Sequence, residues 1–585
     1  MHDHKSWTVE QPGLGLMRLW SCAPFLALIS LVGMLSACGS SGLNEPTGAA
    51  PESTSATVHL TAGEVQTIIA QAATQAQAVG LPVTIAVVDH EGVVLGSFRM
   101  AGATTAITIR GGGSGLLESL TPPPALAEFA AISKAGSAAF LSTQGNAFST
   151  RSASFIVQEH FPPHVRPSPG GPLFGVQFSQ LRCSDVSRNL HPAATANLPL
   201  GLSADPGGLP LYKNGTAVGG IGVEGDGLYS LDRDPSDLDQ ALEEVIAAAG
   251  TFGFSAPTGI RGDRILVDGI TIPFANADPP ASLNTTPYGS LSGTELQAPV
   301  LSPATGFTAS TLGGVAGSVD PGIPIVGSAD VGGLTAPEVT QLLTQAAVQA
   351  NRTRAAIRNP LGSPARVTIT VVDAGGVILG MFRTTDAPIF GFDVSAQKAR
   401  TANFFTRGDA GLTLQAIPAL AGYSTAMTNA GVPLDGSTAF TARAVGLMSQ
   451  PIFPPGASAS FSFGPLSKPL GQWSVFNTGV QFDALDFLGK VVPGTAPCTI
   501  PGLSAVGVPN VSNGFQIFPG SVPLFRGSTH VGAIGVSGDG VDQDDLIAAM
   551  GSVGFEAPAG VRSDTRTVRG VRLPYVVFPR NPNLF

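Results

Sequence analysis

The sequence predicts an α/β (α+β) protein in which one module of helices and strands occurs twice. Residues 83–99, VTIAVVDHEGVVLGSFR, return at 367–383 as VTITVVDAGGVILGMFR, with twelve of the seventeen positions identical. A capped amphipathic helix precedes each copy of this stretch, and a strand, a glycine turn and another helix close each module. A match of this strength within one chain indicates a tandem repeat.

Each repeated stretch has the pattern of a β-hairpin. Two runs rich in β-branched residues flank an Asp-x-x-Gly turn, Asp89–Gly92 in the first copy and Asp373–Gly376 in the second. The Asp side chain can accept a hydrogen bond from the backbone two residues on, and Gly adopts positive φ without steric cost. We therefore expect two paired strands in each copy.

The helices are predicted from caps and apolar spacing. Capping boxes at Thr61–Glu64 and Thr335–Glu338 begin the first helix of each copy, and apolar residues follow at i, i+3 and i+4 spacing. The closing helix of the first copy is expected to bury one face, formed by Leu238, Ala241, Leu242, Val245, Ile246 and Ala249.

The N-terminus has the pattern of an export signal. Arg18 precedes an apolar run, 23–35, that is too short to span a bilayer, and residues 35–38, Leu-Ser-Ala-Cys, look like the cleavage box of bacterial lipoproteins. The alternative is a plain signal peptide with a chance cysteine. We expect Cys38 to carry the lipid and Met17 to be the true start.

These patterns divide the chain into five parts, since 585 residues are too many for one core. The expected parts are a lipoprotein signal segment at 1–38, a flexible tether at 39–58, a first module at 59–276, a Pro/Gly/Ser-rich linker at 277–330 and a second module at 331–585. Gly39 after the cysteine favours the outer membrane of a Gram-negative cell, with the protein periplasmic or at the cell surface.

Charge excludes one class of partner. The formal net charge is -10, and the sequence contains no cluster of Lys and Arg. We therefore expect no nucleic-acid partner, and membrane contact through the N-terminal lipid only.

The order of motifs resembles the GlcG/HbpS-type (DUF336) haem-binding family. The resemblance covers most of 60–260 and 334–558, and the second copy is closer because Ala533–Gly538 reads A-I-G-V-S-G, whereas the first copy has Glu224 in place of the usual Ser and an insert at 111–124. The resemblance implies two tandem profilin-like sandwiches, each a mainly antiparallel sheet flanked by helices. It also implies oligomerisation and, in some members, binding of haem or iron outside the cytoplasm.

Four cations recur in both copies and are candidates for pairing with haem propionates. They are Arg99 and Arg383 at the strand ends, and Lys134 and Lys398 in the next helix. Solvated strand-end charges or structural ion pairs are the alternative interpretation.

Candidate iron ligands are fewer. No Cys-x-x-Cys-His motif is present, so any haem is bound non-covalently. His160 and Met100 are the first residues to test on side-chain type. His160 and His164 flank Phe161-Pro162-Pro163, which keeps them off one helical face and argues against an i, i+4 metal pair.

Other motifs carry less. The run 220–225 fits G-x-G-x-x-G, but it ends its module and the second copy has Ala533 at the first glycine, which argues against dinucleotide binding. Four aspartates miss the spacing of a calcium loop and are expected to cap a helix: Asp232, Asp234, Asp237 and Asp239. No Ser-His-Asp or Cys-His set recurs in both copies, so hydrolysis has no support.

The sequence thus favours an exported, lipid-anchored protein that binds a small ligand, with haem or iron as the leading candidate. A non-catalytic structural or sensory scaffold without a ligand pocket is the alternative. An enzyme of haem or small-acid metabolism is neither excluded nor favoured.

The complete repeat predicts that the two modules pair as an internal pseudo-dimer. Cys183 and Cys498 lie at nearly equivalent points of the two modules, so a disulfide between them would join the modules near a pseudo-two-fold axis. Two separate buried thiols are the alternative.

Overall fold

The computed structural model describes most of the chain beyond the N-terminal segment. The described residues are 58–111, 126–163, 165, 168–181, 184–186, 198–234, 237–267, 269–456, 462–469, 471–487 and 511–584. The signal segment 1–38 and its Cys38 lie outside them, as does the tether up to residue 57. Within these ranges no helix combines the length and the apolar character needed to cross a bilayer.

The first copy begins with the helix that the capping box predicts, α1 (Ala62–Val79). The backbone N–H of Glu64 donates to Thr61 Oγ1 at 3.2 Å, and the N–H of Thr61 donates to the Glu64 carboxylate at 2.8 Å. Gly80 ends the helix in the left-handed region, with a φ of 76°. The side chains at the predicted apolar spacing are buried.

The predicted hairpin follows as β1 (Thr84–Asp89) and β2 (Val94–Met100), which pair antiparallel. Asp89 Oδ1 accepts hydrogen bonds of 2.9 Å from the N–H groups of Glu91 and Val93, which fixes the turn. The local chemistry of the Asp-x-x-Gly sequence therefore accounts for the turn.

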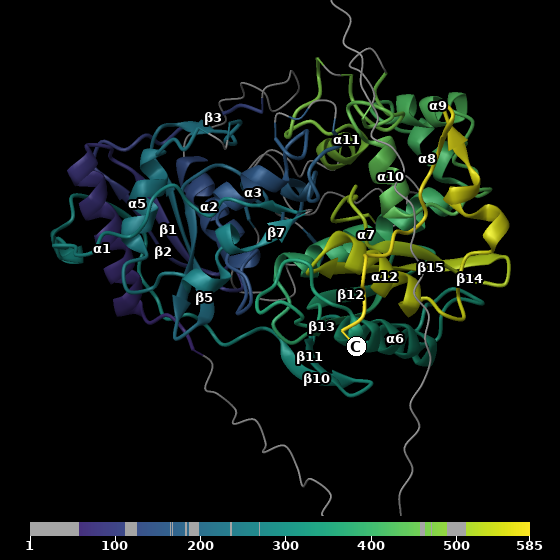
Figure 1. Cartoon of the computed structure of the whole chain (residues 1–585), viewed down its shortest axis with the longest axis horizontal. Helices are drawn as coiled ribbons and strands as arrows, with labels where there is room; N and C mark the ends of the chain where they lie inside the picture. The colour runs from purple at the N-terminus through teal and green to yellow at the C-terminus, as the bar shows by residue number, and fades with distance from the viewer. Residues whose placement is uncertain are drawn as a thin grey trace, which may run out of the picture. The chain divides into compact units, whose positions relative to one another are not determined.

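The sheet of the first copy has the order β4-β5-β1-β2-β9, and all its strands are antiparallel. Its remaining strands are β4 (Gly208–Lys213), β5 (Thr216–Glu224) and β9 (Gly293–Gln297). Helices α1 and α5 (Leu242–Gly250) cover one face, and α2 (Leu126–Phe140) covers the other (Figure 1). Helix α3 (Thr150–Ile156) follows α2.

The second copy repeats this order of elements. Its sheet has the order β10-β11-β13-β12-β15-β14, in which β14-β15-β12-β13 corresponds to β4-β5-β1-β2. The elements are α6 (Ala336–Arg352), β12 (Val367–Asp373), β13 (Ile378–Thr384), α7 (Phe390–Thr406), α10 (Ala442–Met448), β14 (Ser521–Arg526), β15 (Thr529–Gly538) and α12 (Val541–Gly551). The α+β class and the mainly antiparallel sheets expected from the sequence are confirmed.

The segment expected to be a linker, 277–330, contributes strands to both sheets. Strand β9 pairs with β2 of the first copy, and β11 (Val315–Val319) pairs with β13 of the second. Strand β10 (Thr308–Leu312) completes the edge of the second sheet. The strands are mostly exposed or half-buried, so the alternation of buried and exposed residues that marks a strand is weak in this sequence.

Shorter elements surround the two sheets. The helices are α8 (Ala410–Gln415), α9 (Ala421–Asn429) and α11 (Val480–Phe487), with 3₁₀ turns η1 (Val176–Phe178), η2 (Thr258–Ile260), η3 (Gly262–Arg264), η4 (Tyr288–Ser290), η6 (Ala559–Val561) and η7 (Ser563–Thr565). Two-residue strands form three pairs: β3 (Thr108–Ile109) with β6 (Leu228–Tyr229), β7 (Leu266–Val267) with β8 (Ile270–Thr271), and β16 (Thr567–Val568) with β17 (Val571–Arg572).

The closing helix of the first copy corrects one expectation. Helix α5 begins at Leu242, so Leu238 lies outside it and is 73% exposed, and Leu242 is 45% exposed. Ile246 and Ala249 are buried as expected, and Glu243 and Glu244, which were not expected there, are buried beside them. The apolar pattern misplaced the face because it included a loop and left out two buried carboxylates.

The glycines of the G-x-G-x-x-G run belong to β5 and to its packing against α2. A Cβ on Gly222 would lie 2.0 Å from the carbonyl oxygen of Ala131, and one on Gly220 would lie 2.1 Å from that of Ala135. In the second copy, a Cβ on Gly535 would similarly meet the carbonyl oxygen of Ser395 at 2.1 Å. These glycines therefore permit a close approach of helix and strand.

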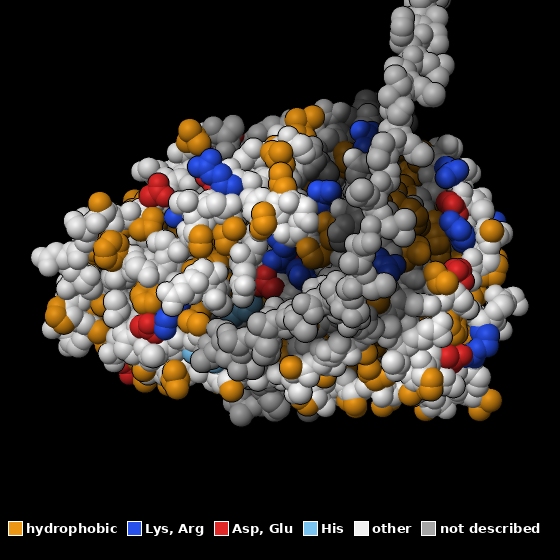
Figure 2. All heavy atoms as spheres, turned by 60° about the horizontal axis from the view of Figure 1, so that its bottom comes forward, with side chains coloured by type: hydrophobic (Ala, Val, Ile, Leu, Met, Phe, Trp, Pro, Cys, Tyr) orange, Lys and Arg blue, Asp and Glu red, His pale blue; other side chains and the backbone are white. Residues whose placement is uncertain are grey.

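The two copies contact one another within the compact unit Thr57–Phe585. One buried apolar cluster contains Ala135 of α2 together with Phe390 and Phe392 of the second copy. In another, the rings of Phe174 and Trp473 stack with 5.4 Å between their centroids. On the face shown in Figure 2, Lys and Arg side chains lie in small groups, several of them beside Asp or Glu.

Candidate functional site

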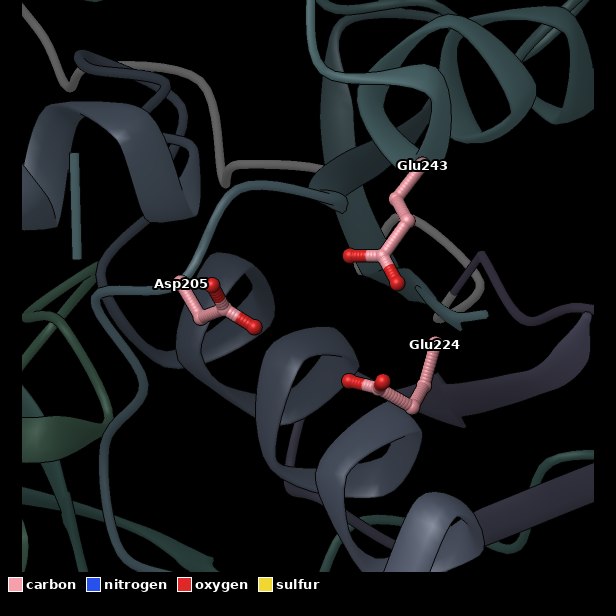
Figure 3. Close-up of side chains that lie close together, drawn as sticks. All are labelled: Asp205, Glu224 and Glu243. Atoms are coloured by element: carbon pink, nitrogen blue, oxygen red, sulfur yellow. The ribbon is translucent and has the colours of Figure 1, made fainter. Parts of the chain in front are cut away.

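Lys134 lies fully buried on α2 among three carboxylates. Its Nζ is 2.8 Å from Asp205 Oδ2, 3.0 Å from Glu224 Oε2 and 2.6 Å from Glu243 Oε2. Asp205 precedes β4, Glu224 ends β5 and Glu243 lies in the first turn of α5, and their carboxylates point toward one another (Figure 3). The site therefore joins three segments of the first copy around one ammonium.

Burial determines how this cluster ionises. It raises the pKa of Asp205 to about 7, raises that of Glu224 well above its ordinary value, and raises that of Glu243. The pKa of Lys134 lies well above its ordinary value because the three carboxylates outweigh its loss of solvation. With three acids and one base, this cluster retains protons at neutral pH rather than ionising completely.

Lys398 is the counterpart of Lys134 in the second copy, with different neighbours. Ser537 stands at the position of Glu224. In the sheets, Glu224 pairs with Thr84, and Ser537 pairs with Thr368, the residue that corresponds to Thr84. Asp544 Oδ2 is 2.8 Å from Lys398 Nζ, and burial raises the pKa of Asp544 to about 7. Burial also lowers the pKa of Lys398.

The ring of Phe518 provides a further neighbour of Lys398. Its centroid lies 4.6 Å from Nζ, and Phe518 stands three residues before β14 just as Asp205 stands three residues before β4. The two lysines are thus buried structural ion pairs in both copies, which is the alternative that the sequence left open for them.

The other residues predicted for ligand binding lie apart. Met100 is 7% exposed and belongs to the apolar core under α1. Arg383 is over the ring of Phe307, 5.2 Å from its centroid, and donates to the carbonyl oxygen of Ala387. Arg99 is half-buried on β2.

His160 is 7% exposed, and its Nδ1 lies 2.9 Å from the carbonyl oxygen of Ser168. His164, the other histidine at the Phe-Pro-Pro sequence, lies outside the described residues, as do Cys183 and Cys498. The disulfide between the cysteines therefore stays a prediction.

A second ion network, partly exposed, recurs in both copies. Its arginines were missed in the sequence, and Asp232 and Asp239 belong to it instead of capping α5, whose N-cap Ala241 has no side-chain cap hydrogen bond. Arg151 of α3 pairs with Glu244 (2.9 Å), Asp232 (2.7 Å) and Asp239 (2.9 Å). Its counterpart Arg443 of α10 pairs with Asp545 and Asp542. Each arginine lies ten residues before the first phenylalanine of a Phe-Pro-Pro sequence, and this shared spacing is the signal that could have identified them.

Two adjoining pockets lie between the copies. Their volumes are about 260 and 410 Å³, and both have Pro172, Val541 and Asp542 in their walls. The walls of the smaller pocket are mainly apolar and come from both copies: Phe148, Ile156, Leu173, Ile357, Phe390 and Val541. In the larger pocket, Phe161 and Phe174 of the first copy face Ile517 and Phe518 of the second.

Each pocket also contains one cation. Arg580 lines the smaller pocket and is exposed, whereas Arg443 lines the larger one. None of the six residues predicted for ligand binding lines either pocket. The sequence could not predict the two pockets, because their walls combine a loop of one copy with the start of α12 in the other.

The described walls combine apolar side chains with Arg443, Arg580 and the carboxylate of Asp542. Ligand pockets usually enclose roughly 300–1,000 Å³ and combine apolar walls with a few placed polar groups. The described walls contain no His, Met, Tyr or Cys, so they offer apolar contact and guanidinium groups but no iron ligand.

Comparison with known proteins identifies part of the second copy. Residues 490–552 match the family model described as haem degrading protein HbpS-like. No curated protein matches the chain.

Several solved structures are similar to parts of the chain. PduOC in complex with haem is 20% identical over 34% of this chain and 99% of that chain, with a TM-score of 0.21. Protein ORFY of Klebsiella pneumoniae is 20% identical over 35% and 97%, with a TM-score of 0.21. A double mutant of HbpS from Streptomyces reticuli is 20% identical over 36% and 96%, with a TM-score of 0.19. The match at 490–552 confirms the predicted resemblance for the second copy, which carries an HbpS-like segment.

Proposed function

We propose that this protein binds haem, non-covalently, in the two adjoining pockets between its copies. The observation that carries the proposal is the pair of contiguous, largely apolar pockets with one arginine each. The family description for residues 490–552 supports haem over other flat acids. In this proposal the two copies act as an internal pair, and each contributes one wall.

The residues fit the group in two respects. Phe390, Leu173 and Val541 provide apolar surface for a macrocycle, and Arg443 and Arg580 are placed for carboxylates. Since the described walls contain no iron ligand, the affinity for haem depends on burial of the macrocycle against apolar side chains and on the pairing of its carboxylates with the arginines. Bound haem would supply redox and oxygen chemistry, whereas these protein residues exclude water and orient the ligand.

Ala356→Phe tests the location of the site. Ala356 is exposed and lines the smaller pocket, so a phenyl ring at this position fills the mouth without disturbing the core. Titration of the purified chain with haemin, followed by the Soret band, should show saturation for the wild type and a loss of affinity of about tenfold or more in Ala356→Phe.

The matched control is Ala78→Phe, at an exposed position on α1 that lines neither pocket. Its haemin affinity should equal that of the wild type. Absence of saturation in the wild type at micromolar haemin would exclude the function, and equal affinities of the wild type and Ala356→Phe would exclude the pocket. A non-catalytic scaffold would be the remaining interpretation after the first result.

We further propose that the protein is exported and anchored through a lipid on Cys38. The cleavage-box sequence at 35–38 supports this proposal. Mass spectrometry of the mature protein should find a lipid-modified N-terminal Cys38, and the Cys38→Ser variant should be released from the membrane fraction. An unmodified Cys38 in the membrane fraction would contradict the proposal.

A further inference from the structure

Arg151 and Arg443, the arginines of the repeated ion network, occupy equivalent positions in the two copies and pair with equivalent carboxylates. Arg151 and Arg443 occupy the second position of α3 and α10, and each pairs with a buried carboxylate of the closing helix, Glu244 or Asp545. Their surroundings differ because the first copy has residues 228–241 between Gly227 and α5, whereas α12 begins directly after Gly540.

In the first copy, Asp232 and Asp239 of this additional segment lie in front of Arg151. Asp232 Oδ2 lies 2.7 Å from Arg151 Nη1, and Ser154 Oγ and Gln158 Nε2 both donate to the Asp232 carbonyl oxygen, at 3.1 and 2.5 Å. Arg151 is 1% exposed. Two carboxylates of the chain itself, those of Asp232 and Asp239, therefore occupy the position in front of Arg151 Nη1.

In the second copy the corresponding position is open. The counterparts of Arg151, Ser154 and Gln158 are Arg443, Gly446 and Gln450, and all three line the larger pocket. Since α12 begins directly after Gly540, no described residue of the second copy corresponds to Asp232. Arg443 donates through Nε to Asp545 and through Nη2 to Asp542, and its Nη1 donates no hydrogen bond to any residue that the structure describes.

We infer that Arg443 Nη1 binds the carboxylate of the ligand, and that the protein has one such site per chain because Asp232 occupies the equivalent position in the first copy. The inference rests on the proposed function and specifies the anchoring residue and the stoichiometry. Arg443 already pairs with two carboxylates. Arg151, its counterpart, pairs with three, those of Asp232, Asp239 and Glu244. The first copy thus demonstrates that this arrangement accommodates a further carboxylate.

Haemin and its dimethyl ester separate this inference from the proposed function. The ester keeps the macrocycle and the iron but has no carboxylate. For the wild type we expect one haemin per chain and an ester that binds at least about tenfold more weakly, since the ester has no carboxylate for either Arg443 or Arg580. Arg443→Lys keeps the charge for Asp545 and Asp542 but lacks Nη1, so it should bind haemin several-fold more weakly than the wild type, by no more than the loss that the ester shows.

Arg151→Lys is the matched control, with the same replacement at the occupied position. It should bind haemin within about twofold of the wild type. Two haemins per chain, equal affinities for haemin and ester in the wild type, or an equal loss in both lysine variants would each overturn the inference. Where a variant does not fold, equal affinities of the wild type for haemin and ester still overturn the inference, because no carboxylate would then be bound. Wild-type protein that binds neither compound would overturn the proposed function instead.

Discussion

Glu224→Gln should stabilise the protein, and the gain should grow as the pH rises. Glu224 is fully buried and shares one ammonium, that of Lys134, with Asp205 and Glu243. The pKa of Glu224 in the folded state lies well above its ordinary value because burial disfavours the carboxylate. Glutamine preserves the shape of the side chain and carries no charge in either state.

The sign follows from proton binding. Above the ordinary glutamate pKa, the unfolded chain releases this proton while the folded chain retains it, so rising pH favours unfolding of the wild type. The free energy of unfolding should therefore fall by roughly 1 kcal/mol more per pH unit in the wild type than in Glu224→Gln until the folded-state pKa is reached.

Urea denaturation of both proteins at pH 5, 6 and 7 measures this difference. Other charged groups face the cluster, among them Asp226, but they are common to both proteins and cancel in the comparison. Glu556→Gln, the same replacement at an exposed position, serves as the control for the substitution itself. Parallel pH profiles of the wild type and Glu224→Gln would refute the reasoning, because they would mean that Glu224 is as ionised in the folded protein as in the unfolded chain.

Three further outcomes are expected. Lys398→Met should destabilise the fold by about 3 to 5 kcal/mol at pH 8, because it leaves the buried Asp544 carboxylate without its ammonium. The loss should be smaller at pH 5, where Asp544, with a pKa of about 7, is protonated. Urea denaturation measures both losses, and Lys398→Met/Asp544→Asn should recover part of the loss at pH 8. Lys134→Met leaves three carboxylates without an ammonium and should lose more stability at pH 8 than Lys398→Met; an equal loss would contradict the view that the first copy carries the larger excess of acid. Met100→Ala should cost about 2 to 5 kcal/mol on denaturation while the haemin affinity is unchanged, because Met100 is a core side chain; a weakened haemin titration would place it in the site.

Local chemistry made the elements of the modules predictable. The capping boxes of α1 and α6 and the Asp-x-x-Gly turn each depend on residues within four positions of one another, so the sequence contains all the partners. The repeat then predicted a second copy of the same fold. Prediction failed at α5, where residues 228–241 shifted the start of the helix and thereby its buried face.

The candidate sites depended on partners that are distant in the sequence. Lys134 and Lys398 were found because they recur, but a repeated lysine does not indicate whether it faces a ligand or a carboxylate of the closing helix. Glu224, noted only as a departure from the family pattern, belongs to the Lys134 cluster. The walls of the pockets require the two copies to meet, and no spacing within one copy contains that information.

A crystal structure of the full chain with haemin tests the central claim most directly. The account predicts density for one macrocycle between the copies, against Phe390 and Val541, with a carboxylate on Arg443 and no macrocycle at Arg151. A haem bound at Lys134 or Lys398, or a second haem at the first copy, would contradict it.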